Sequence, residues 1–261
     1  MAKSNGSLQE RLLSVMDQKH HWGWSQITGE KITKQQLLSH FQQEFEVYVR
    51  DFPLLLARVM GRVPAHRSQL IRDLAENIYE EQTGGLSAEF SKNKSHPDLF
   101  LKMMKGLGYP EKAFTKISLL PTSLAYRSYI DLVTLTMDWR LGAVLLTIFV
   151  EGSIEDRARL EKNYKNTKTL EQKLKNHSLH KHHGLKVSDM DLVRSHHAVE
   201  GAHRKSAWES VLQELNSPEL EDQATEVLRN ALDLWLLFRD GVCLEMGLQH
   251  PEFERLAKIQ G

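Results

Sequence analysis

Residues 141–151 read LGAVLLTIFVE, an apolar run that ends in a carboxylate. The run Leu141–Val150 is well short of the roughly 20 residues that span a bilayer, so it predicts a helix buried inside a globular protein. Glu151 follows directly, and an unpaired charge beside a core is costly. We therefore expect a cationic partner for Glu151, either an arginine such as Arg157 or Arg159 or a metal ion.

Helical periodicity continues on both sides of this run, with almost no alternating strand pattern. Residues 163–187 are basic and predict a loop or insertion, and residues 1–7 are expected to be disordered. The sequence thus predicts an all-α fold, with residues 1–261 as a single domain built as one bundle of about seven helices. The predicted helices span about residues 8–20, 33–61 with a bend before Pro53, 65–82, 97–107, 123–162, 188–215 and 218–247.

The composition limits what such a bundle binds. Lys plus Arg and Asp plus Glu both number 34, so no excess charge points to nucleic acid or an acidic membrane as a partner. The single cysteine, Cys243, excludes a sulfur-rich metal site and is compatible with a reducing compartment. No export signal is recognisable, so a cytoplasmic location is the default expectation. Any metal must be held by nitrogen and oxygen, and the chain has 13 histidines.

Ligand-type side chains gather in SHHAVEGAHRK, residues 195–205. At about 100° per residue, His196, Glu200 and His203 lie within roughly 60° of one another on a helix, whereas His197 points about a quarter-turn away. One helix face therefore carries His, Glu and His, the residue types of a metal site. Taken alone, the same spacing is also compatible with a polar face of i,i+3 and i,i+4 contacts.

Two earlier segments carry similar side chains. In residues 65–82 Glu81 continues the buried apolar face of the predicted helix, whereas Glu80 lies about 100° from it. His96 opens the next helix beside Pro97. The alternatives are a solvated face for the glutamates and a simple capping role for His96.

Together these segments supply three carboxylates and three imidazoles. Oxygen and nitrogen ligands in this ratio suit iron or manganese, and three carboxylates offset most of the charge of two divalent ions. Without a metal, clustered carboxylates would repel one another and take up protons. The sequence therefore predicts a dinuclear metal site between helices. Its six candidate ligands are Glu81, His96, Glu151, His196, Glu200 and His203.

The same segments resemble the haem-oxygenase-like diiron oxidases, which have a TenA/PqqC-like fold and include the chlamydial protein associating with death domains and its para-aminobenzoate-forming relatives. The resemblance lies in NIYEEQTGG (77–85) followed by SHPDLFLKMMKGLG (95–108), in Glu151 after a buried helix, and in H-x-x-x-E-x-x-H at 196–203. A fainter likeness lies in residues 30–59, so that the resemblance covers most of residues 30–215.

By this resemblance the six residues correspond one for one to the family's metal ligands, which hold two Fe(II) ions that react with O2. The resemblance implies a small-molecule substrate, often derived from an amino acid or a fatty acid, that undergoes N-oxygenation, desaturation or oxidative C–C cleavage. An external electron donor and a homodimer are compatible with it. Glu200 stands where the family often has Asp. Trp24, His40 and Val150 stand where some relatives have a tyrosine that they consume, so that chemistry is not expected here.

Two other functions remain open on the same bundle. One is a cofactorless or thiamin-degrading enzyme, although thiamin degradation needs a nucleophilic cysteine and Cys243 is remote in sequence from the candidate acids. The other is a non-catalytic interaction protein, which would bind no metal tightly. In a diiron oxidase or in a thiamin-degrading enzyme, three residues are candidates to reach a substrate carboxylate from the bundle interior, namely Tyr48, Arg50 and Arg58.

Overall fold

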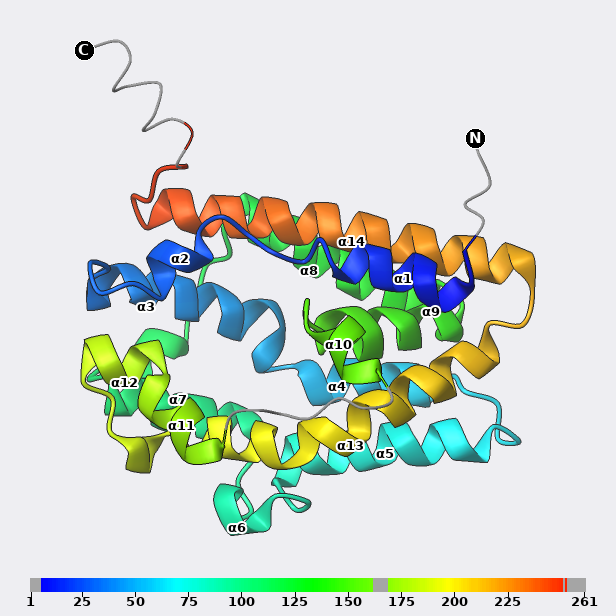
Figure 1. Ribbon diagram of the computed structural model, residues 1–261, viewed down its shortest axis with the longest axis horizontal. Helices are drawn as coiled ribbons and strands as arrows, with labels where there is room; N and C mark the ends of the chain where they lie inside the picture. Colours follow the sequence, from blue (N-terminus) through cyan, green and yellow to red (C-terminus); the bar gives the residue numbers. More distant parts are fainter. Residues whose placement is uncertain (1–5, 162–168, 251, 253–261) are drawn as a thin grey trace.

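The computed structural model describes residues 6–161, 169–250 and 252, except for the side chains of residues 199–203. Within these residues every regular element is helical, which confirms the all-α prediction (Figure 1). The elements are α1 (Leu8–Met16), α2 (Trp24–Ile27), α3 (Lys34–Glu44), η1 (Phe45–Val49), α4 (Phe52–Met60), α5 (Ser68–Thr83), α6 (Ala88–Ser91), α7 (His96–Gly106), η2 (Glu111–Phe114), α8 (Pro121–Thr136), α9 (Trp139–Ala143), η3 (Val144–Val150), α10 (Asp156–Leu160), α11 (Leu170–Asn176), α12 (Ser178–His183), η4 (Val187–Asp189), α13 (Asp191–Glu214) and α14 (Pro218–Glu245).

The long helix α14 forms one side of the bundle, with α8 and α1 packed along it (Figure 1). Ser217 caps its first turn by accepting a hydrogen bond from the Leu220 N–H at 3.3 Å, and Pro218 takes the first helical position, where its missing N–H costs nothing. On the opposite side α5 and α13 lie side by side, and α4 packs on α5 (Figure 1). In the described part of the chain, neither α14 nor any other helix has the length and hydrophobicity to cross a membrane.

The apolar run 141–150 lies in the core of the molecule. Its side chains from Val144 to Leu146, and those of Ile148 and Phe149, are fully buried. Most of this run, η3, is a π-helix that contacts α9, α13 and α14. A second π-helical segment, η1, carries Tyr48. Because π-helical turns are rare and often mark functional sites, we expect a functional site near these two segments.

The prediction of one helix over residues 123–162 is wrong. The chain leaves the α-helical conformation at Met137, whose ψ is 173°, and the Asp138 side chain then starts α9 by accepting the Arg140 N–H at 2.9 Å. The chain breaks again after η3, before α10 begins at Asp156. These interruptions contribute to the difference between the observed helical segments and the about seven predicted from periodicity; short segments such as α2, α6, α11 and α12 account for others.

Residues 163–187 are predicted to be a loop or an insertion; the loop alternative is wrong where the structure describes this stretch, because α11 and α12 lie there, and the insertion stays a prediction. Thr169 and Gln172 form a capping box at the start of α11: Thr169 Oγ1 accepts the Gln172 N–H at 3.2 Å, and Gln172 Oε1 accepts the Thr169 N–H at 3.0 Å. Residues 162–168 lie outside the described residues, as do residues 1–5, on which most of the predicted N-terminal disorder falls.

Candidate metal centre

Glu80 and Glu81 lie in the last turn of α5, which ends at a left-handed glycine. Gly84 has a φ of 59°, a conformation that glycine adopts without steric cost. The chain then folds back over the helix end, where Glu80 Oε2 accepts the N–H groups of Leu86 at 2.7 Å and Ser87 at 3.1 Å, and Oε1 accepts the Ser87 hydroxyl. Glu80 is therefore buried and fixed by this loop.

His96 is the first residue of α7, and its ring lies between two carboxylates of α5. Its Nδ1 is 2.9 Å from Glu81 Oε1, and its Nε2 is 3.3 Å from Glu80 Oε1. The capping role that the sequence left open for His96 belongs instead to Ser95, whose hydroxyl accepts the Asp98 N–H at 3.1 Å. The buried His96 side chain thus joins the ends of α5 and α7.

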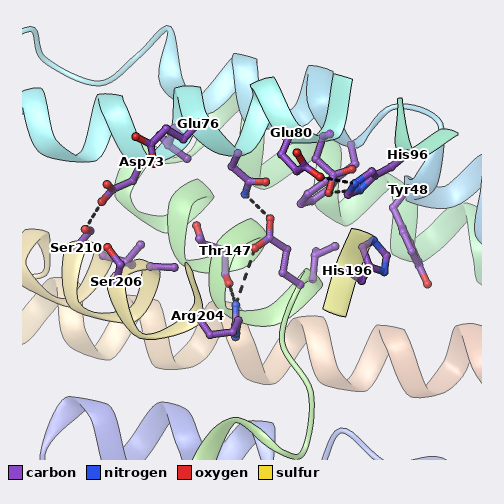
Figure 2. A pocket seen from close by; sticks show the side chains of 18 of the residues that line it. Tyr48, Asp73, Glu76, Glu80, His96, Thr147, His196, Arg204, Ser206 and Ser210 are labelled. Carbon is purple, nitrogen blue, oxygen red and sulfur yellow. Dashed lines mark hydrogen bonds and ion pairs between the residues drawn. The ribbon is translucent and has the colours of Figure 1, made fainter. Parts of the chain in front are cut away.

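His196 on α13 completes a group of three. Its ring centroid is 4.8 Å from that of His96, with an angle of 73° between the ring planes. One ligand atom from each of Glu81, His96 and His196 lies within 4.8 Å of the others. Figure 2 shows His96 and His196 at one end of the pocket. Three separate helices therefore deliver nitrogen and oxygen donors to one place.

A cavity of about 320 Å³ opens beside this group, between α5, α13 and the end of η3. Glu151 lines it together with Glu81, His96 and His196. Asp73 and Ser210 line its other end, where the Ser210 hydroxyl donates to the Asp73 carboxylate. A cavity of this volume is within the range of small-molecule sites.

The π-helix η3 ends at Glu151, whose N–H donates to the Leu146 carbonyl at 3.2 Å. Asn77, one turn before Glu81 on α5, donates its side-chain N–H to Glu151 Oε1. Arg204 Nη1 lies 4.0 Å from Glu151 Oε2. The cation that the sequence requires near Glu151 is therefore Arg204.

The two arginines that the sequence suggests as partners of Glu151 pair with other carboxylates. Arg157 pairs with Glu10 at 2.8 Å and with Asp17 at 2.7 Å. Arg159 pairs with Glu155 at 2.6 Å. The prediction that an arginine faces Glu151 is therefore confirmed, but the arginine is Arg204 and not Arg157 or Arg159.

Two basic side chains, the buried Arg204 and the partly buried Lys19, hold the C-terminal end of η3, where a helix leaves carbonyl groups without partners. Arg204 donates to the Thr147 carbonyl, to the Ile148 carbonyl at 3.1 Å and to the buried carboxylate of Asp156. Lys19 Nζ donates to the carbonyls of Phe149 at 2.5 Å and Gly152 at 2.7 Å. These contacts fix the backbone that presents Glu151.

The carboxylates of the centre affect one another's protonation. Burial raises the pKa of Glu151 to about 7, although Arg204 and Asn77 oppose the shift. The Glu151 side chain is still 25% exposed, because its free surface faces the cavity. Burial alone would lower the pKa of His96, but Glu81 and then Glu80 outweigh it and raise that pKa. Proton uptake of this kind is expected of clustered carboxylates that lack a cation.

A family model described as iron-containing redox enzyme matches residues 39–236, which include all six predicted ligands. The chain belongs to this family. Its fold is similar to the crystal structure of a TenA homolog from Pseudomonas syringae pv. tomato, with a TM-score of 0.67 at 13% identity over 91% of this chain and 93% of that chain. A likeness at this identity shows the fold alone. No curated protein matches the chain in sequence.

These comparisons confirm the haem-oxygenase-like fold that the resemblance predicts. Four of the six predicted ligands line one cavity, namely Glu81, His96, Glu151 and His196. The side chains of Glu200 and His203 lie outside the described residues, although both residues belong to α13. Metal ligation by the six residues stays a prediction.

The described residues fit an iron ion. His96 Nδ1 is buried and makes no hydrogen bond to any side chain that the structure describes, although Glu81 Oε1 is only 2.9 Å away. Two donors that bind one ion at about 2.1 Å and at right angles lie about 3 Å apart, which is the spacing of this pair. Imidazole nitrogen and carboxylate oxygen are also donor types that iron accepts.

Sequence reasoning missed three residues that support the ligands, namely Asn77, Glu80 and Arg204. Asn77 could have been found, because it lies four residues before Glu81 and so on the same helix face. Glu80 adjoins a candidate ligand, but its role depends on a loop that folds back only in the structure. Arg204 acts on carbonyl groups more than 50 residues away in the chain, and no local pattern indicates that contact.

Proposed function

We propose that this member of the iron-containing redox enzyme family is a non-haem diiron enzyme that uses O2 to oxidise a small organic molecule. The observation that carries the proposal is the convergence of Glu81, His96 and His196, with ligand atoms within 4.8 Å of one another, beside Glu151. Glu200 and His203, four and seven residues after His196 on α13, would complete the two metal positions.

Two ferrous ions, when bound, supply the electrons and the open coordination positions with which O2 is reduced. The chain's part is to orient the ligands. When Glu80 is ionised, its carboxylate only accepts hydrogen bonds. The pKa of Glu80 is lowered, because the contacts with Ser87, the Leu86 N–H and His96 outweigh burial, which alone would raise it. Glu80 therefore holds the proton of His96 on Nε2, which leaves the Nδ1 lone pair directed at Glu81 and the metal position.

The substrate would occupy the cavity beside these ligands. Leu70, Leu74 and Val211 give this cavity apolar walls, which would contact the apolar part of such a molecule. The proposed substrates are amino-acid- or fatty-acid-derived molecules, and the proposed outcomes are N-oxygenation, desaturation or oxidative C–C cleavage. Mass spectrometry of both substrate classes, incubated with iron-loaded protein and O2, identifies the product.

The test is an anaerobic Fe(II) titration of the full chain followed by measurement of O2 consumption. We expect close to two irons per chain and rapid O2 uptake in the wild type. Glu151→Ala and His203→Ala should each abolish the O2 reaction. His197→Ala is the matched control, because His197 contacts Lys173 at 3.0 Å instead of lining the cavity, and it should behave like the wild type. Equal O2 consumption in Glu151→Ala and the wild type would refute the proposal.

The thiamin-degrading alternative receives no support from Cys243. The thiol is buried, burial raises its pKa to about 11, and it is not among the residues that line the two cavities described for this chain. A non-catalytic interaction protein would leave the Fe(II) titration without tight binding, so the same experiment distinguishes that function.

A further inference from the structure

A second cavity, of about 390 Å³, adjoins the metal-centre cavity, and Tyr48 and Val150 line both. The aromatic side chains of Trp24, Tyr126 and Trp235 form much of its wall. These residues come from α2, α8 and α14, so the second cavity lies on the α14 side of Tyr48 and the metal centre on the α5 side. The function proposed above gives this second cavity no role.

The charged groups of the second cavity do not cancel. Arg239 is buried and binds Glu44 Oε1 at 2.6 Å and the Tyr48 hydroxyl at 3.1 Å, and its guanidinium lies 4.9 Å from the Trp24 ring. Arg239 and Glu44 therefore neutralise each other. Lys19 also lines the cavity, and it donates to backbone carbonyls and pairs with no carboxylate among the described residues. Burial lowers the pKa of Lys19 to about 7, so its amine is only partly protonated at neutral pH, and a bound anion would favour its charged form.

Tyr126 adds an unused hydrogen-bond donor. The residue is 1% exposed and lines the second cavity, and its hydroxyl makes no hydrogen bond with any residue that the structure describes. Burial raises its pKa, so the phenol stays protonated and acts as a donor. The hydroxyl keeps some accessible surface, so it can meet a molecule in the cavity. A bound molecule with an acceptor atom would supply the missing partner.

We infer that the second cavity binds the carboxylate of the organic substrate, with Tyr126 as hydrogen-bond donor and Lys19 and Arg239 as the nearby positive charges. The remainder of the molecule would pass Tyr48 and Val150 toward the metal centre. A carboxylate fits because it accepts the Tyr126 hydrogen bond and stabilises the charged form of Lys19. A primary amine would place a positive charge beside Lys19 and Arg239, and an alcohol would supply no negative charge to stabilise them. Only the passage toward the metal rests on the proposed function.

The test uses the metal-free full chain, so that a carboxylate has no metal to bind. Octanoate, octan-1-ol and octylamine are titrated separately by calorimetry, with the fluorescence of Trp24 and Trp235 as a second signal from the cavity wall. We expect octanoate to bind at least about tenfold more tightly than either analogue, since hydrogen bonds to charged groups are among the strong ones. Octanoate that binds no more tightly than octan-1-ol would overturn the inference.

The decisive variant is Tyr126→Phe, which removes only a hydroxyl that has no described partner and so should not weaken folding. It should reduce the affinity for octanoate about tenfold. Tyr79→Phe is the matched control, because Tyr79 is exposed on α5 and lines neither cavity, and it should bind as the wild type does. Unchanged binding in Tyr126→Phe would overturn the assignment. Octanoate binding without Fe(II) binding would refute the diiron function but leave the carboxylate site intact.

Discussion

Replacing Glu80 by Gln tests how the centre keeps His96 ready to bind a metal. The Gln side-chain oxygen can still accept the N–H groups of Leu86 and Ser87, so the loop after α5 keeps its anchor. The side-chain NH2 then takes the place of Oε1, where it faces His96 Nε2. An NH2 group cannot accept the Nε2 proton, so the variant favours the tautomer with the proton on Nδ1. That tautomer has no lone pair for a metal on the side of Glu81.

The expected loss follows from this single contact. Keeping Nε2–H against an NH2 group leaves a buried donor unsatisfied, which costs about 1–3 kcal/mol. Moving the proton to Nδ1 instead removes the lone pair that would bind the metal. The loss of Fe(II) affinity is therefore set by whichever of these two changes has the smaller free-energy cost. A loss of about 10-fold to 100-fold in Fe(II) affinity is therefore expected, as for other residues that orient metal-binding histidines. The free energy of unfolding of the metal-free protein should change much less, because the backbone hydrogen bonds to residue 80 remain.

Anaerobic competition with a chromophoric Fe(II) chelator measures the affinity, and urea unfolding of the metal-free protein measures the stability. Glu89→Gln is the matched control, because it removes the same charge from an exposed residue of α6. Fe(II) affinity in Glu80→Gln equal to that of Glu89→Gln would refute the reasoning. A parallel collapse of stability would show that Glu80 acts on the fold and not on the histidine.

Three further predictions concern stability. Burial lowers the pKa of His40 from 6.5 to about 4, so the unfolded chain takes up a proton before the folded protein does, and His40 lowers the free energy of unfolding by about 3 kcal/mol as the pH falls from 7 to 4. Urea unfolding of His40→Gln across this range should lack that decrease, and equal pH slopes in the two proteins would contradict the prediction. Arg204→Met leaves the buried Asp156 carboxylate without its cation and should lower the free energy of unfolding by about 3–5 kcal/mol, whereas Arg157→Met at an exposed ion pair should cost less than about 1 kcal/mol. Fe(II) at 100 times its Kd should raise the free energy of unfolding of the wild type by about 2.7 kcal/mol; thermal unfolding should show this gain reduced in Glu81→Ala.

The sequence predicts the helices well where local chemistry marks their ends. Pro218 follows the capping residue Ser217, and α14 begins there as predicted. The prediction fails at Met137 and Asp138, because the residues on both sides have helical periodicity, which hides the capping signal of Asp138 at the start of α9. The capping box at Thr169 and Gln172 is a local signal, and it was available in the basic stretch that we expected to be a loop.

The candidate site was predictable to the extent that its residues share helix faces. Glu81 extends an apolar helix face and His196 lies on a face with Glu200 and His203, so helical geometry alone selects them. The supporting contacts are a different case, because Glu80 and Arg204 act through backbone groups brought together by folding. A sequence can indicate which residues are able to bind a metal more readily than it can indicate what orients them.

The position of Glu151 shows the limit of helical geometry most clearly. In η3 the hydrogen bonds join each N–H to the carbonyl five residues earlier, so each residue advances by less than the 100° of an α-helix and the side chains that follow point in a different direction. A helical wheel drawn from Leu141 would therefore misplace Glu151. The backbone also needs partners for the carbonyl groups at the end of η3, and Lys19 and Arg204 supply them. The same contacts hold Val150 between the two cavities, so the π-helix and its two cations set both where the metal-side carboxylate lies and where a substrate would pass.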